Sequence, residues 1–123
     1  MKWFVALLLA GLLTACSNSK PDAEQFRFLG EVPFSRDVWA QGNEATRASL
    51  VYDFIKQHRE RQTLTRGDVL ENLGEPTTYA TQEFFPAYTI AQGENRYVVV
   101  FVPKSPDLNS EIVRVDLEEY PAI

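Results

Sequence analysis

The chain has 123 residues, with 17 acidic and 12 basic side chains and a formal net charge of −5. This length accommodates one modest domain, and the acidic balance argues against duplex DNA as the main partner, because phosphate binding requires a basic surface. Hydrophobic residues make up 45% and aromatic residues 12% of the chain, which is enough for a core and too much for a disordered protein.

The first fifteen residues have the pattern of a secretory signal. Residues 3–13 form an apolar run behind a single base, Lys2, and this run is shorter than the roughly 20 apolar residues that span a bilayer. Residues 13–16 (Leu-Thr-Ala-Cys) close the run and resemble the lipobox of bacterial lipoproteins. The resemblance implies cleavage before Cys16, a thioether-linked lipid on its sulfur and acylation of the new amino terminus.

Lipidation also explains why Cys16 is the only cysteine of the chain, since a thiol in an oxidising envelope normally has a disulfide partner. The alternative is an ordinary signal peptide followed by a lone cysteine. Lipoproteins with Asp after the lipidated Cys tend to stay at the inner membrane, whereas this chain has Ser17. The resemblance therefore implies a lipid anchor in the outer membrane, on its periplasmic face. We divide the chain into a signal peptide (1–15), a lipidated cysteine with a flexible tether (16–25) and a single domain (26–123).

The start of the domain, residues 26–39, is rich in aromatic side chains but has no regular period, and Gly30 and Pro33 interrupt it. We expect an extended segment that wraps the domain, with a short turn near residues 35–39. Aromatic residues at this density more often belong to a core than to a ligand site.

The first predicted helix covers residues 43–62, and either Asn43 or Thr46 can cap its start. One apolar stripe recurs at helical spacing and ends on a histidine. Its members are Ala48, Val51, Phe54, Ile55 and His58, with Leu50 at the margin.

The second predicted helix, residues 65–73, has both of its ends encoded in the sequence. Thr65 followed three residues later by Asp68 is a variant of the capping box. Gly74 can adopt the left-handed conformation that closes a helix, and Pro76 prevents its continuation. We therefore treat Thr65, Gly74 and Pro76 as structural residues.

After Pro76 the hydrophobic period becomes that of strands. We expect strands over residues 84–91, 96–102 and 111–119, with a turn at 92–95 and a loop at 103–110. In the last strand, alternation predicts Val113, Val115 and Leu117 on one face and Ile112 on the other. The predicted fold is α+β: two helices packed on a three-stranded antiparallel meander (ααβββ).

Residues 64–76 carry a family resemblance, because they read LTRGDVLENLGEP. This run resembles the signature of the SmpA/OmlA (BamE-like) domain, whose pattern G-M-T-x-x-x-V-x-x-x-L-G-x-P forms the second helix and its end. The matching positions are Thr65, Val69, Leu73, Gly74 and Pro76, while Thr63 and Leu64 replace the family's Gly-Met. The resemblance covers residues 39–117 and implies a preceding helix, a following three-stranded antiparallel sheet, and a partner in the machinery that assembles outer-membrane β-barrels.

The sequence contains no recognisable catalytic or metal-binding motif. His58 is the only histidine, whereas a metal site needs two or more ligands of the His and Cys type. Its place on the apolar stripe favours a packing role. We see no nucleophile constellation and no glycine-rich phosphate loop, so we expect neither an enzyme nor a cofactor.

Two surfaces remain as candidate sites. The basic residues Lys56, Arg59, Arg61 and Arg66 could meet anionic lipid headgroups near the anchor, or they could form a solvated helix end that complements the macrodipole. Both faces of the strand at 96–102 are apolar. The face that carries Tyr97, Val99 and Phe101 is either covered by residues 26–39 or is a docking surface for a protein partner.

The predicted function is that of a non-enzymatic, lipid-anchored envelope protein that binds or holds another protein. The partner implied by resemblance is the β-barrel assembly machinery. The alternative is a periplasmic ligand-binding or inhibitor module with the same fold, because a concave sheet can also hold a lipid or cover an enzyme.

Overall fold

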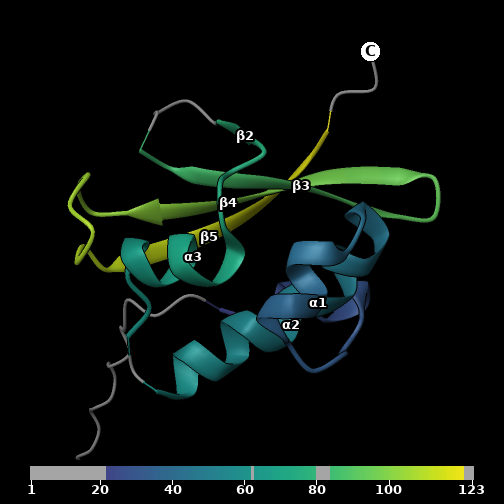
Figure 1. Ribbon diagram of the computed structural model, residues 1–123, viewed down its shortest axis with the longest axis horizontal. Coiled ribbons are helices and arrows are strands. Elements are labelled where there is room, and N and C mark those ends of the chain that lie inside the picture. Colours follow the sequence, from purple (N-terminus) through teal and green to yellow (C-terminus); the bar gives the residue numbers. More distant parts are fainter. Residues whose placement is uncertain (1–21, 62, 80–83, 121–123) are drawn as a thin grey trace, which may run out of the picture.

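The computed structural model describes residues 22–61, 63–79 and 84–120 (Figure 1). The predicted signal peptide, Cys16 and most of the tether lie outside these residues. The elements in chain order are a 3-10 helix η2 (Glu24–Leu29), helices α1 (Arg36–Gln41), α2 (Glu44–Glu60) and α3 (Arg66–Leu73), and strands β2 (Thr78–Tyr79), β3 (Pro86–Gln92), β4 (Asn95–Pro103) and β5 (Ile112–Glu119).

The four strands form one antiparallel sheet in the order β2-β3-β4-β5. Figure 1 shows α1, α2 and α3 gathered on one side of this sheet. The predicted α+β fold, in which helices precede an antiparallel meander, is confirmed. The two-residue strand β2 was not predicted, and it adds a short fourth member at the β3 edge.

The meander turns where the sequence predicted. Gln92 pairs with Asn95, which leaves a two-residue hairpin loop, and Gly93 supplies the positive φ of 60° that such loops require. A register shift between Val102 and Pro103 then interrupts the pairing of β4 with β5.

Because of this bulge, the predicted alternation of β5 is wrong at Ile112 and Val113. Ile112 packs in the core cluster on the helix side of the sheet, and Val113 packs in the cluster on the far side. The sequence pattern had placed them the other way round, because an extra residue in a bulge reverses the alternation on one side of it.

The two predicted helices, α2 and α3, form with the caps that the sequence indicated. The Asn43 side chain accepts a hydrogen bond from the backbone N–H of Thr46 at 2.9 Å, and α2 begins at the next residue. Thr65 and Asp68 complete a capping box at the start of α3, with reciprocal hydrogen bonds of 3.1 and 3.0 Å. Each cap satisfies donors that the first helical turn leaves without partners.

Gly74 ends α3 with φ +77° and ψ −160°. Its φ is positive, as expected for a glycine that closes a helix, but its ψ lies outside the left-handed helical region that we predicted. The N–H of Gly74 donates to the carbonyl of Leu70 at 2.9 Å. This backbone conformation is essentially restricted to glycine.

We expect Gly74→Ala to lower the free energy of unfolding by about 1–3 kcal/mol, the usual cost of forcing a residue with a Cβ into this region. A Cβ at Gly74 would meet no atom within 4 Å, so the loss would come from the backbone alone. Thermal melting measures it, with Glu75→Ala at the exposed next residue as the control. Equal melting temperatures for the two variants would contradict the positive φ.

Residues 26–39 differ from the predicted extended segment. They contribute the last part of η2 and most of α1, joined by a short irregular stretch. Phe26, Leu29 and Trp39 are all buried in the core cluster between helices and sheet. Their spacing shows no clear helical period because a six-residue 3-10 helix and a six-residue α-helix each present only a few residues to the core. The prediction that the aromatic side chains of this segment belong to the core is correct for Phe26 and Trp39.

Candidate interaction surface

The surface predicted from Tyr97, Val99 and Phe101 is wrong, because these residues point toward the helices. Val99 and Phe101 are each only 1% exposed, and Tyr97 packs partly buried against the same cluster. The ring of Phe101 meets that of Phe54 on α2 at 6.1 Å between centroids. A protein partner therefore has no access to the central strand from this side.

The far side of β4 offers no open apolar face either. Val98, Val100 and Val102 are buried there, together with Ala87 of β3. Phe85, Val113 and Tyr120 pack around this cluster. Both faces of the central strand are thus buried.

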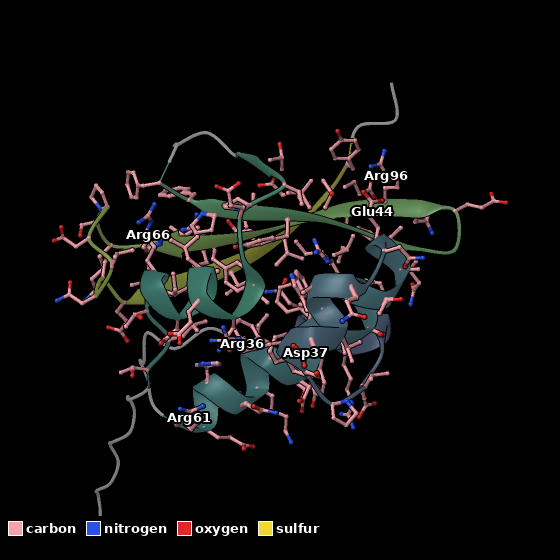
Figure 2. All side chains as sticks on the ribbon, viewed as in Figure 1. Arg36, Asp37, Glu44, Arg61, Arg66 and Arg96 are labelled. Atoms are coloured by element: carbon pink, nitrogen blue, oxygen red, sulfur yellow. The ribbon has the colours of Figure 1, made fainter. Side chains whose placement is uncertain are left out.

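The four basic residues proposed for headgroup contact do not form one patch. Figure 2 shows Arg61 at the far end of α2, whereas Arg66 lies beside the sheet. Lys56 pairs with Glu60 at 3.6 Å, and Arg59 pairs with Asp22 at 4.0 Å. Exposed pairs of this kind contribute little to stability.

Arg66 forms structural hydrogen bonds that were not predicted from the sequence. Its guanidinium donates to the backbone carbonyls of Phe84 at 2.9 Å and Pro106 at 3.0 Å. The backbone N–H of Gly67 donates to Leu108 at 2.7 Å. Arg66 and Gly67 therefore fasten the loop between β4 and β5 to the start of α3, which removes Arg66 from the proposed headgroup contact.

His58 lies in the core, as predicted. It is 7% exposed, its Nδ1 lies 3.1 Å from the carbonyl oxygen of Phe54, and its ring packs on that of Phe54. Among residues 22–61, 63–79 and 84–120, no group of His, Cys, Asp and Glu has the arrangement of a metal site.

A charged cluster that the sequence did not predict joins α2 to the hairpin of β3 and β4. Arg96 contacts both carboxylate oxygens of Glu44, at 3.2 and 3.0 Å, and Thr89 donates to the same carboxylate at 3.0 Å. The guanidinium of Arg96 also lies over the ring of Tyr120, 4.4 Å from its centroid. Figure 2 shows Glu44 and Arg96 side by side at one end of the sheet. Residues 52 positions apart meet here, which no local pattern encodes.

The hydrogen bond from Arg96 holds the pKa of Glu44 below its ordinary value of 4.5; the bond from Thr89 acts in the same direction, and partial burial opposes both. Because the folded state has the lower pKa, this carboxylate adds stability above about pH 4.5, and the contribution disappears as the pH falls through the folded pKa.

We expect Arg96→Met to move the pKa of Glu44 up toward its ordinary value. The substitution should lower the free energy of unfolding most at neutral pH, and this loss should become smaller as the pH falls and Glu44 is protonated. Titration of carboxyl carbons by NMR measures the shift, with the wild-type chain as the reference. An unchanged titration of Glu44 in Arg96→Met would contradict the assigned cause.

The outer edge of the sheet, strand β5, provides a different candidate surface. The N–H of Tyr120 donates to the carbonyl of Arg96, so these two residues form a hydrogen-bonded pair across the ladder. Backbone groups alternate in direction along an antiparallel strand. Val115, Leu117 and Glu119 therefore direct their N–H and C=O groups away from β4.

Among the described residues, hydrogen-bond partners are found for the first half of this edge only. The N–H of Ile112 donates to Leu64, and the side chain of Gln25 donates to the carbonyl of Val115 at 3.1 Å. Beyond that point, no described residue bonds the outward backbone groups of Leu117 and Glu119. We call residues 116–119 the open edge.

Charged and aromatic side chains flank the open edge. Glu118 and Glu119 are exposed and have no ion pair with any described residue, whereas Asp116 is paired with Arg114 at 2.9 Å. On the helix side, Phe28 is 51% exposed and contacts Tyr97, the cross-strand neighbour of Glu119, edge to face at 5.9 Å. The open edge thus combines negative charge, nearby apolar surface and backbone groups that have no hydrogen-bond partner in the described part of the chain.

Comparison of the chain with family models, with curated proteins and with solved structures gives no match. None of the helices in the described part of the chain is long and apolar enough to cross a membrane.

Proposed function

We propose that this chain is a lipid-anchored protein of the bacterial envelope, whose domain acts by binding another protein rather than by catalysis. The anchor is Cys16, proposed from the lipobox pattern of residues 13–16. The observation that carries the binding role is the open edge, because unpaired backbone groups at a sheet edge are a template for another chain.

The location and the partner follow from the sequence resemblances and are part of the proposal. Ser17 after the lipidated cysteine favours the periplasmic face of the outer membrane. The resemblance of residues 64–76 to the SmpA/OmlA (BamE-like) signature makes the β-barrel assembly machinery the first partner to test. A small acidic domain on a short tether would act there as a module that holds its partner close to the membrane.

Crosslinking in intact cells tests this proposal. The full chain with a C-terminal affinity tag is purified from crosslinked envelopes, next to a control in which residues 1–25 carry the tag alone. We expect at least one envelope protein to be enriched only by the full chain. Equal enrichment by both would overturn the binding role, and an unmodified thiol on Cys16 in intact-mass measurements would overturn the anchor.

A further inference from the structure

We propose that the open edge of β5 binds an extended segment of the partner as an added strand, and that this segment carries basic side chains. This inference rests on the proposed function, because it specifies how the domain holds a protein. Addition of a strand derives its affinity from main-chain hydrogen bonds and its specificity from alternate side chains.

The backbone of β5 sets the length and position of the added strand. Leu117 and Glu119 lie two residues apart, so their outward groups are spaced by about 7 Å, the repeat of an extended strand. The bond from Gln25 to Val115 closes the edge on one side of them. The space therefore fits a short strand of three or four residues, which begins beyond Val115 and runs toward the hairpin end of the sheet.

The charge of the open edge determines the chemistry of the partner. Glu118 lies opposite Val98, on the far side of the sheet, and Glu119 lies opposite Tyr97, on the helix side. Neither carboxylate has an ion pair among the described residues. Opposite charges on directly facing strand positions are favourable and like charges are unfavourable, so a strand with Lys or Arg at these positions is preferred.

The same charges disfavour a second copy of this chain as the occupant. A two-fold antiparallel pairing of β5 with itself, centred on Leu117, would place Asp116 opposite Glu118 of the other copy, twice. Natural sheet edges use inward or flanking charge in this way to prevent edge-to-edge association.

Apolar surface on the helix side adds a second requirement. Leu117 is partly buried there, and Phe28 exposes half of its surface on the same side. A β-branched or aromatic side chain of the added strand would lie over Leu117, and the next two residues would face Glu118 and Glu119. The preferred ligand therefore has one apolar residue followed by two basic residues.

A binding assay with the full chain in a neutral detergent tests this inference. The probe is a fluorescent, end-blocked octapeptide, Lys-Lys-Val-Lys-Lys-Val-Lys-Lys, which can place Val opposite Leu117 and Lys opposite both glutamates in either strand direction. Fluorescence anisotropy gives its dissociation constant at physiological salt. We expect the double variant Glu118→Lys/Glu119→Lys to weaken binding at least tenfold. We expect the single variant Glu119→Pro to weaken it at least tenfold as well. The proline removes an outward N–H without touching the β4 ladder. Because it also removes the carboxylate, Glu119→Gln is measured beside it, and the difference between these two neutral variants gives the effect of the lost backbone hydrogen bond.

The matched control is Glu75→Lys with Asp107→Lys, which makes the same charge change at two exposed residues elsewhere. We expect its affinity to stay within twofold of the wild type, and melting curves verify that each variant is folded. Three outcomes would each overturn strand addition. The control could lose as much affinity as the edge variant, Glu119→Pro could bind the peptide as tightly as the wild type, or a peptide with Pro in place of Val could bind equally well. Self-association of the chain through this edge would overturn it as well.

The crosslinking experiment, repeated with these variants, separates this inference from the proposed function. If the wild type enriches a partner and the edge variants keep it, the domain binds a protein by another surface and the inference fails. If the wild type enriches nothing, the proposed function fails, while the peptide assay still decides the chemistry of the edge.

Discussion

Val99→Asp should unfold the domain. Val99 is 1% exposed, and it lies in the central strand between Tyr88 of β3 and Leu117 of β5. It belongs to the same buried cluster as Phe54 of α2 and Val69 of α3. An ionised carboxylate buried there without a partner costs several kcal/mol, and neutralising it still leaves unpaired polar atoms. A domain of this size has about 5–15 kcal/mol of stability in total.

Circular dichroism of the full chain in detergent measures this effect, as the loss of a cooperative thermal transition. Val32→Asp is the matched control, because it makes the same chemical change at a residue that is 46% exposed. We expect the control to melt within a few degrees of the wild type. A normal transition for Val99→Asp would show that the side of β4 that carries Val99 does not face the core.

Helices α2 and α3 were predictable from sequence because their signals are local. The caps at Asn43 and at Thr65 each depend on a side chain and a backbone group three residues apart. Gly74 and Pro76 encode the end of α3 in the same way, although only the sign of φ at Gly74 was predictable and not its ψ. The hairpin at Gly93 is another local signal, since two-residue loops favour residues that accept positive φ.

Two features that sequence reasoning missed depend on how neighbouring strands pair. Strand β2 exists only where β3 pairs with it, and the bulge that reverses Ile112 and Val113 lies opposite the step from Val102 to Pro103 in the neighbouring strand. The strand at 95–103 has apolar residues on both faces, so its sequence could not indicate which face the helices would cover. For that reason the predicted partner surface lies in the core.

The candidate site shows the same limit. The exposed charge of Glu118 and Glu119 is visible in the sequence, but the free backbone beside them depends on the order of the strands in the sheet. Gln25 closes part of the edge from a helix 90 residues away in the chain. The sequence could have indicated the open edge only through its last strand, because the last strand of a meander pairs with a neighbour on one edge and leaves the other edge unpaired.

The second large effect is expected at Trp39, which we predict to be the main contact between α1 and the rest of the domain. It is 1% exposed, and its indole N–H donates to the carbonyl of Leu73 at the end of α3 at 2.9 Å. Its ring meets Tyr88 of β3 at 5.8 Å, and the guanidinium of Arg47 of α2 lies 4.9 Å from it. One side chain thus contacts three other elements.

Trp39→Ala should lower the free energy of unfolding by about 3–5 kcal/mol, since it leaves a large cavity and an unpaired carbonyl. Trp39→Phe keeps most of the aromatic packing and loses the hydrogen bond to Leu73, so we expect an intermediate loss of about 1–3 kcal/mol. Urea titration measures both, with Val38→Ala at the exposed neighbouring position as the control. If Trp39→Phe is as unstable as Trp39→Ala, the hydrogen bond outweighs the packing. If neither differs from the control, α1 is not joined to the domain through this residue.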